Sequence, residues 1–300
     1  MSPMKSFNSS RRSVLRLLSG FILQRPLLAY SAPEPLPNEE FAAIERRIGV
    51  RLGVSALDTA TGRRLEHRAS ELFAMCSTFK FLLAASILKR VDSGTEDLKR
   101  SIAYSQRDLL EYAPVTQAHV QEGAMTVGDL CAAAIAVSDN AAANLLLAQI
   151  GGPAGLTAFI RTLGNQVTRL DRIEPELNSA IADDPRDTTS PTAMVDSMQK
   201  LLLGDGLSAQ SRVQLATWLE KSSTGGNRLR AGIPSNWRAG DKTGTGDNGA
   251  LGDIGIFWPP NKPPILIAAY VMEGNATREA RERAIASAGK LTAQVLWGKF

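Results

Sequence analysis

Histidine and cysteine are scarce in this chain of 300 residues, which contains two of each. His67 and His119 form no H-x-H or H-E-x-x-H pattern, so neither a histidine zinc site nor a Ser-His-Asp triad is expected. The sequence has no G-x-x-x-x-G-K-[ST] loop to hold nucleotide phosphates. We therefore expect no metal and no cofactor, and any nucleophile must take its base from lysine or a carboxylate.

Acidic residues are absent from the first 31 positions. The segment contains five basic residues, Lys5, Arg11, Arg12, Arg16 and Arg25, and therefore carries a charge of +5. Because the whole chain carries +4, the remaining 269 residues carry −1. A near-neutral body lacks the basic surface that collects phosphates. We therefore expect no nucleic-acid partner.

The same segment has the pattern of an export signal. SRRS at 10–13 precedes an apolar run, and AYS at 29–31 places small residues at positions −3 and −1 of a cleavage site. Paired arginines before a short apolar run are typical of a twin-arginine signal peptide. A basic anchor that stays attached is the alternative. Arg25-Pro26 interrupts the apolar run before the roughly 18 residues that a spanning helix needs. We expect cleavage after residue 31, a periplasmic location and no membrane attachment of residues 32–300.

Strand patterns occupy both ends of the body, with helical patterns between them. Hydrophobic periodicity and turn residues predict strands at 51–56, 64–67, 238–245, 252–258 and 265–272, and helices at 38–48, 79–91, 127–136, 140–150 and 277–297. This order predicts an α/β lobe made of about 32–71 and 222–300, with an inserted all-helical lobe of about 72–221. A cleft is expected between the lobes.

A long irregular stretch runs from about 164 to 190 inside the helical part. It contains Pro175, Pro185 and many charged residues. Connectors of this length are uncommon in compact domains and are usually functional or disordered. We expect a functional loop here.

The pattern S-x-x-K is the first candidate for nucleophilic chemistry. On a helix, residues three apart share a face, so the Lys80 amine can reach the Ser77 hydroxyl. Only Ser77 stands at a predicted helix start after a strand and turn, where backbone N–H groups can stabilise an oxyanion. The pattern alone is weak because it occurs four more times, at Ser2/Lys5, Ser86/Lys89, Ser197/Lys200 and Ser287/Lys290.

Two further tripeptides make the pattern specific. SDN at 138–140 precedes a predicted helix, where its ordinary role would be helix capping. KTG at 242–244 lies on a predicted strand, where a lysine could simply protect a sheet edge. Each tripeptide occurs once, in this order after Ser77, so the combination is far more specific than its parts.

This set resembles that of the class A β-lactamases and penicillin-binding proteins. EPELN at 174–178 resembles the Ω-loop motif of the β-lactamases, which carboxypeptidase and transpeptidase relatives lack. The likeness covers nearly all of residues 38–298. It implies an α/β (α+β) fold with a five-stranded antiparallel sheet flanked by helices, an inserted all-helical lobe, and an Ω-type loop at 169–187 in which Arg172 would pair with Asp187.

The resemblance also implies a role for each site residue. Ser77 would be the nucleophile, and its N–H and that of Thr245 would form the oxyanion hole. Either Lys80 or Glu174 would be the acylation base, a choice left open for this family. Ser138 would relay a proton to the ring nitrogen, and Glu174 with Asn178 would hold the deacylating water. The substrate-binding residues would be Tyr112, Asn140, Arg228, Lys242, Thr243, Gly244 and Thr245.

The implied function is hydrolysis of penicillins and cephalosporins by a monomeric enzyme that confers β-lactam resistance. Two alternatives remain open at this point: a D-Ala-D-Ala carboxypeptidase or other penicillin-binding protein, and a catalytically silent β-lactam sensor. Glu174 and Asn178 argue against the first, and the intact Ser77 and Lys80 argue against the second.

The two cysteines, Cys76 and Cys131, are expected to be free thiols. One disulfide of related enzymes would need a cysteine where this chain has Gly246, and another would need one in place of Ala84. Neither pairing is available. A disulfide between Cys76 and Cys131 themselves would suit an oxidising compartment and is the alternative.

Overall fold

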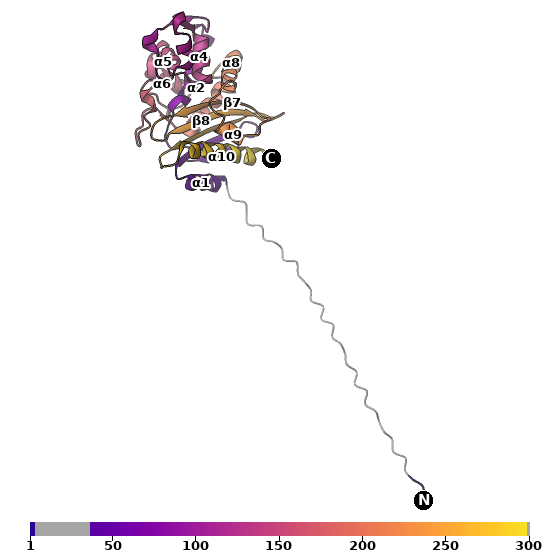
Figure 1. The fold of residues 1–300 in the computed structure, drawn as a ribbon. Helices are drawn as coiled ribbons and strands as arrows, with labels where there is room; N and C mark the ends of the chain where they lie inside the picture. Colours follow the sequence, from indigo (N-terminus) through magenta and orange to yellow (C-terminus); the bar gives the residue numbers. More distant parts are fainter. Residues whose placement is uncertain (4–36, 299–300) are drawn as a thin grey trace. The chain divides into compact units, whose positions relative to one another are not determined.

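A five-stranded antiparallel sheet organises the protein (Figure 1). The computed structural model describes residues 1–3 and 37–298, so nearly all of the expected leader at 1–31 lies outside the described residues. The strand order is β2-β1-β9-β8-β7, which joins strands from both ends of the body as the sequence predicts. The strands are β1 (Arg51–Asp58), β2 (Arg64–His67), β7 (Arg238–Thr245), β8 (Leu251–Trp258) and β9 (Ile265–Met272).

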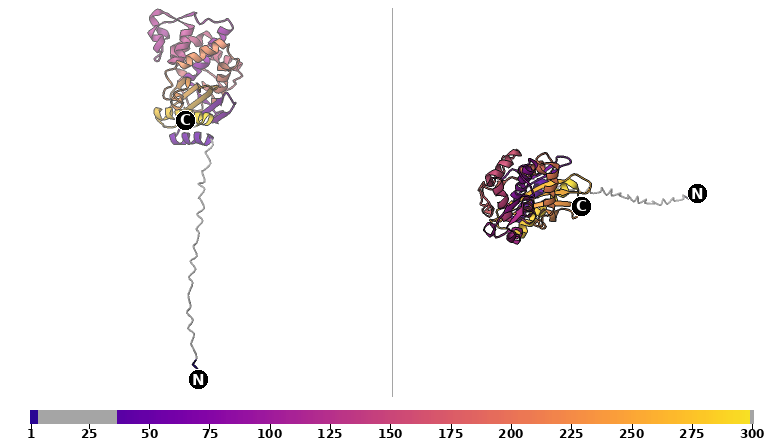
Figure 2. Two further views of the ribbon diagram at one scale, coloured as in Figure 1. Left: turned by 90° about the vertical axis from the view of Figure 1, so that its right-hand side faces the viewer. Right: turned by 90° about the horizontal axis from the view of Figure 1, so that it is seen from above.

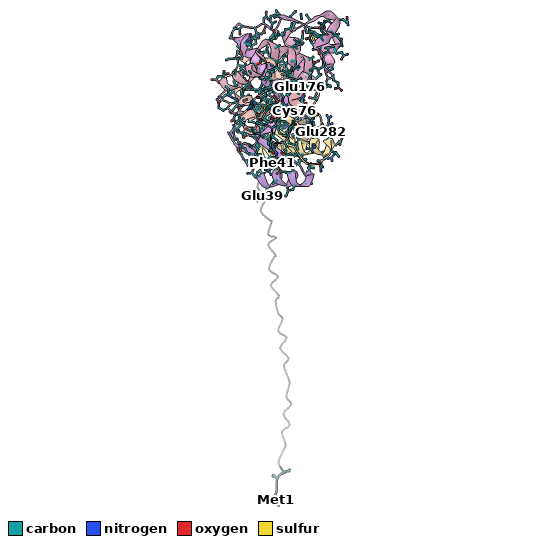
Figure 3. All side chains as sticks on the ribbon, turned by 90° about the vertical axis from the view of Figure 1, so that its left-hand side faces the viewer. Met1, Glu39, Phe41, Cys76, Glu176 and Glu282 are labelled. Atoms are coloured by element: carbon teal, nitrogen blue, oxygen red, sulfur yellow. The ribbon has the colours of Figure 1, made fainter. Side chains whose placement is uncertain are left out.

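The sheet is buried on both faces, and β9 shows how its sequence permits this. Successive side chains of a strand point to opposite faces. Ile265 and Ile267 join the core toward α1 (Pro37–Ile48) and α10 (Arg278–Trp297), whereas Leu266 and Ala268 join the core on the other face. Figures 1 and 2 show α1 and α10 together on one face of the sheet. Phe41 of α1, labelled in Figure 3, is completely buried in that layer.

Helices cover the other face, and most of them belong to the inserted region. They are α2 (Phe79–Asp92), α3 (Pro114–Ala118), α4 (Val127–Ala136), α5 (Asn140–Gln149), α6 (Gly152–Thr162), α7 (Pro191–Leu202) and α8 (Ala209–Glu220). The four-residue α9 (Leu229–Gly232) instead packs against α10, and its Leu229 belongs to the core on that side of the sheet. Within residues 37–298 no single helix is long and apolar enough to cross a membrane. Only α5 and α6 taken together reach that composition, and they are bent by 73°.

The inserted region is mainly helical and also contains elements too short to leave a periodic pattern. Two small sheets pair β3 (Phe73–Ala74) with β6 (Thr188–Thr189) and β4 (Ser101–Ala103) with β5 (Ala124–Thr126). Single 3-10 turns form η1 (Cys76–Thr78), η2 (Gln106–Asp108), η3 (Val120–Glu122) and η4 (Glu176–Asn178). By its internal contacts the chain divides after Glu34, so both expected lobes belong to one unit, Pro35–Phe300.

Helix α2 is the central element of the helical layer. Its residues from Phe79 to Leu88 are all buried, as expected for a helix that is apolar on every side. Lys80 is the one charged residue in that run. A charged group so placed requires hydrogen-bonding partners inside the protein, and those partners form the site described next.

Candidate active site

Ser77 lies in η1, the turn that leads into α2. This turn packs directly against β7 of the sheet. Ser77 is only 8% exposed. The packing is so close that a Cβ on Gly244 would stand 2.5 Å from the Met75 carbonyl oxygen. Only glycine permits this approach of backbone to backbone, which explains the third residue of the KTG tripeptide.

The Glu174 carboxylate connects Ser77, the predicted nucleophile, to Lys80. Ser77 Oγ donates to Glu174 Oε1 at 3.2 Å, and Lys80 Nζ lies 2.9 Å from the same oxygen. Asn178 Nδ2 donates to the other oxygen, Oε2. All of these groups are buried or partly buried, so little water screens their charges. The structure therefore brings together the four residues that the sequence assigns to attack and deacylation.

The SDN segment provides the next wall of the site. Lys80 Nζ donates to the Ser138 carbonyl oxygen at 2.9 Å and to Asn140 Oδ1 at 2.5 Å. Lys242 Nζ donates to Ser138 Oγ at 3.0 Å, so the Ser138 hydroxyl lies between two ammonium groups. Burial lowers the pKa of Lys80, although Glu174 opposes the shift. The pKa of Lys242 falls well below its ordinary range because of burial and because Lys80 is near.

Asp139 fixes the SDN segment and does not face the cleft. It caps α5 by accepting from the Ala142 N–H at 2.9 Å, as its ordinary capping role predicts. Its second oxygen accepts from the N–H groups of Val115 and Thr116, each at 2.9 Å. The turn so held gives Ser138 a φ of +63°, an uncommon value for a residue with a side chain.

Asn144 is a site residue that sequence reasoning missed. Its amide accepts from the Glu174 N–H at 3.0 Å and donates to the Glu174 carbonyl oxygen at 2.8 Å, which ties the loop to α5. Asn144 stands one helical turn after Asn140, and residues four apart share a helix face. That spacing is the signal that could have identified it.

The neck of the Ω-type loop forms as expected. Arg172 Nε donates to Asp187 Oδ2 at 2.6 Å, which confirms the pairing that the resemblance implied. Asp187 Oδ1 also accepts from the N–H groups of Asp171 and Arg172, at 2.7 and 3.0 Å. Asp187 is completely buried. The two ends of the loop are thus joined by one carboxylate.

Arg228 organises the other end of the cleft from beneath. It is 2% exposed, and its Nη1 donates to the carbonyl oxygens of Gly244 and Gly252 at 2.7 and 2.8 Å. Its Nη2 donates to Thr245 Oγ1 at 2.7 Å. Burial lowers the pKa of this guanidinium. Asp253 fixes the adjoining chain by accepting from the Leu229 N–H at 3.0 Å.

These groups surround a cleft of about 340 Å³. Tyr112 lies at its rim and is 52% exposed. Two lining residues, Thr224 and Arg278, were not anticipated from the sequence; Thr224 Oγ1 lies 2.6 Å from Thr243 Oγ1. The residues that line the cleft are Ser77, Tyr112, Ser138, Asn140, Asn178, Thr224, Arg228, Thr243, Thr245 and Arg278.

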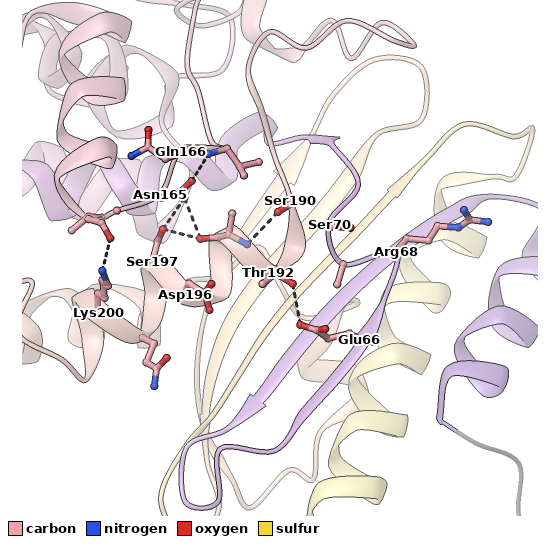
Figure 4. A pocket seen from close by; sticks show the side chains of 16 residues that line it. Glu66, Arg68, Ser70, Asn165, Gln166, Ser190, Thr192, Asp196, Ser197 and Lys200 are labelled. Carbon is pink, nitrogen blue, oxygen red and sulfur yellow. Dashed lines mark hydrogen bonds between the residues drawn. The ribbon is translucent and has the colours of Figure 1, made fainter.

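A larger cavity, of about 840 Å³, lies elsewhere in the described part of the chain (Figure 4). It is formed by α7, β2 and the segment that follows α6. Its polar side chains bond mainly to the protein, as Lys200 does to the Leu163 carbonyl oxygen at 2.6 Å. No serine of this cavity lies beside a lysine and a buried carboxylate as Ser77 does. The smaller cleft is therefore the candidate active site.

Neither cysteine forms a disulfide: Cys76 and Cys131 are both free and buried, which confirms the expectation. Burial raises the pKa of Cys76 to about 12, so its thiol stays protonated beside the nucleophile. Within residues 1–3 and 37–298, no group of three His, Cys, Asp or Glu side chains could hold a metal ion.

Comparison with known proteins gives one consistent family. Residues 37–296 match the model of the β-lactamase enzyme family. The structure resembles an ancestral class A β-lactamase (GNCA) at 55% identity and a TM-score of 0.85, with 87% of this chain and 100% of that chain covered. For the enzyme of the last common ancestor of Gram-negative bacteria (GNCA4), identity is 56%, the TM-score 0.85 and the coverage 87% and 99%. PenP of Rhodopseudomonas palustris, described as a candidate class A β-lactamase, is 51% identical with a TM-score of 0.84 and coverage of 86% and 99%. A buried Ser-Lys-Glu cluster within this fold, together with these matches, places the chain in the class A β-lactamase family of hydrolases.

Proposed function

We propose that the protein hydrolyses penicillins and cephalosporins through an acyl-enzyme on Ser77. In the first step Ser77 Oγ attacks the lactam carbonyl carbon, and the N–H groups of Ser77 and Thr245 bind the oxyanion. Each such donor contributes about 3 kcal/mol to lowering the barrier. The amide C–N bond then breaks, and the ring nitrogen takes a proton from the Ser138 hydroxyl, which Lys80 and Lys242 hold in place. Lys80 gives a proton back to Ser138 and takes from Glu174 the one that came from Ser77, so Glu174 is again a carboxylate.

We assign the acylation base to Glu174. The Ser77 hydroxyl donates directly to the Glu174 carboxylate. The Lys80 ammonium instead donates to Glu174, Ser138 and Asn140. Among the described contacts the Ser77 hydroxyl bonds to the carboxylate and not to the amine, so Glu174 is the group placed to accept the serine proton. Lys80 then acts by holding Glu174 and Ser138 with its positive charge.

Deacylation uses the same carboxylate. Glu174 takes a proton from a water molecule, and the water oxygen attacks the ester carbonyl carbon. The ester C–O bond then breaks, and Glu174 gives the proton to Ser77 Oγ, which restores the hydroxyl and the carboxylate. Asn178 orients Glu174 through Oε2. The buried contact of Glu174 with Ser77 is the single observation that carries the proposal, because a penicillin-binding protein has no such base and stays acylated.

The carboxylate of the substrate would bind at the end of the cleft beside Lys242 and Arg228. Lys242, Thr243 and Thr245 would bind the carboxylate common to penicillins and cephalosporins, and Arg228 orients Thr245 from below. Asn140 and Tyr112 would contact the acylamino side chain. In a bacterium, this activity would confer resistance to β-lactams.

Nitrocefin hydrolysis by the purified protein tests the proposal. We expect many turnovers per protein molecule, a persistent acyl-enzyme with Glu174→Ala by mass spectrometry, and no labelling of Ser77→Ala. A single turnover by the parent protein would instead identify a penicillin-binding protein or sensor. If Glu174→Ala acylates at the parent rate, Lys80 is the acylation base.

We also propose export by the twin-arginine route and a monomeric mature protein. The family match begins at residue 37, which leaves the arginine-rich segment outside it. Replacing Arg11 and Arg12 by lysine should retain the protein in the cytoplasm. Light scattering of the mature protein tests its oligomeric state.

A further inference from the structure

The cleft contains two arginines with different access to a substrate. Arg228 is buried, and its guanidinium nitrogens donate to Gly244, Gly252 and Thr245. The Arg278 side chain is 64% exposed and lines the same cleft. No other residue lining the cleft is charged, since Lys80 and Lys242 are completely buried and contribute no surface to it. Among the residues that line the cleft, Arg278 is therefore the cation that is exposed to a bound substrate.

The position of Arg278 costs stability rather than adding to it. It is the first residue of α10, directly after the capping residue Thr277. Unpaired N–H groups give a helix start a partial positive charge, so a cation there is unfavourable. Its partner among the described residues is Glu282 on the next turn, with Nε to Oε1 at 3.3 Å. Exposed pairs of this kind contribute little. A role toward a ligand accounts for a cation in this place.

Glu282, labelled in Figure 3, connects Arg278 to the carboxylate-binding end of the cleft. Its Oε1 lies 3.5 Å from Arg228 Nη2, and that nitrogen donates to Thr245 Oγ1 at 2.7 Å. Thr245 is thus connected to Arg278 by a series of side-chain contacts through Arg228 and Glu282. A group bound by Arg278 would be one that extends past the carboxylate held at Thr245.

In a cephalosporin the ring carboxylate is on C4, and the substituent of C3 is attached to the neighbouring carbon. With the carboxylate at Thr245, that substituent points away from the acylamino side chain. We propose that Arg278 is a specificity-determining residue that binds an anionic C3 substituent of a cephalosporin. The inference rests on the proposed function, since it takes the substrate orientation from it.

Ceftriaxone and cefotaxime form a matched pair for the test. Their acylamino side chains are identical, but the C3 substituent of ceftriaxone ends in an acidic heterocycle, whereas that of cefotaxime is a neutral acetoxymethyl group. We expect Arg278→Gln to raise KM for ceftriaxone about three- to fivefold, the size of an exposed ion pair, and to leave KM for cefotaxime nearly unchanged. Salt at 0.5 M should reduce this difference in the parent enzyme by screening.

Arg283→Gln is the matched control because Arg283 is an exposed arginine of α10 that does not line the cleft. It should change neither KM, and Arg278→Lys should retain part of the preference. Equal changes for the two antibiotics with Arg278→Gln, or the same effect from Arg283→Gln, would overturn the proposal. If acylation occurs without turnover, the hydrolytic function is wrong, and acylation rates measured by mass spectrometry still compare the two antibiotics. If neither antibiotic acylates the protein, both proposals fail.

Discussion

The two halves of the active site are supported in different ways. Ser77 and Lys80 lie at the start of α2, and Lys242 lies on β7, so main-chain hydrogen bonds of regular elements hold all three. Glu174 and Asn178 lie on the Ω-type loop at 169–187, whose only regular piece is the 3-10 turn η4. The nucleophile and the two lysines thus depend on the backbone of the fold, whereas the proposed base of both steps depends on a few side-chain bonds.

This difference has a kinetic consequence. In acylation Glu174 only accepts a proton from a nucleophile that η1 holds, whereas in deacylation it must also hold the attacking water. Substitutions of the side chains that hold the loop should therefore slow both steps, and deacylation more than acylation, although none of them touches the substrate. Misplacing a reacting group by about 1 Å can cost 100-fold in rate. The variants below separate the two steps, and they are ordered by the size of the expected effect.

Asp187→Ala should have the largest effect. It leaves the buried N–H groups of Asp171 and Arg172 without an acceptor and removes the ion pair at the neck. We expect a loss of about 3 kcal/mol in the free energy of unfolding and a fall of about 10- to 100-fold in the deacylation rate. Urea unfolding and pre-steady-state kinetics with nitrocefin measure the two quantities.

Asp187→Asn is its control. Asparagine keeps one acceptor oxygen and tolerates the φ of +58° found here, so most of the loss should be restored. If Asp187→Ala slows acylation as much as deacylation, the neck supports the entire cleft and the proposed separation is wrong.

Asn144→Ala should have a smaller effect of the same kind. It removes both bonds to the Glu174 backbone while the neck stays closed. We expect deacylation to slow about tenfold, with acylation changed much less, as measured by acyl-enzyme accumulation during turnover. Gln149→Ala, at the end of the same helix, should leave both rates at the parent values. Unchanged acyl-enzyme levels in Asn144→Ala would show that Asn144 does not position the base.

The sequence predicts the first half of the site better than the second, for a physical reason. The Ser77, SDN and KTG segments belong to elements with strong periodic patterns, and glycine at 244 is required by the close packing at Met75. The strands of the five-stranded sheet and the helices α1, α2, α4, α5 and α10 were predicted to within a few residues. No bounds were predicted for α6, α7 and α8, although they are of similar length to α1. The two small sheets were missed because strands of two or three residues show no alternation.

The sequence identified the Ω-type loop but did not predict its contacts with the rest of the protein. Glu174 and Asn178 were identified because EPELN at 174–178 resembles the family's motif. The pairing of Arg172 with Asp187 was predicted from the same family resemblance. The attachment to Asn144 and the proximity of Arg278 depend on how α5 and α10 pack against neighbours distant in the chain. Local sequence holds no information on such packing. The burial of Arg228 and the bonds of its two Nη atoms were also not foreseen, since they depend on how β7 and β8 pack.

The pH dependence of substrate binding tests the cationic half. Burial places the pKa of Lys242 well below the ordinary value of 10.5, so raising the pH removes its charge before that value is reached. We expect kcat/KM to fall on the alkaline side at a pH below 10.5, mainly through a rise in KM, because Lys242 would bind the carboxylate in the proposed function. Lys242→Arg should abolish this limb because a guanidinium stays protonated. A limb that persists in Lys242→Arg belongs to another group, such as Lys80.

The cysteines should show the smallest effect, because Cys76 adjoins the nucleophile and yet takes no part in the chemistry. Its thiol is 1% exposed with a pKa raised to about 12, and Cys131 is completely buried. Thiolate, not thiol, reacts with disulfide reagents. We expect DTNB to leave the native enzyme unmodified and fully active, and to label two thiols per chain in guanidinium chloride.

Ser93→Cys, which places a thiol at an exposed position after α2, is the control and should react at once in the native state. Rapid labelling of the native parent would show that the η1 turn opens. Fewer than two thiols after unfolding would show that the cysteines pair, and the backbone around Ser77 would then have a covalent support.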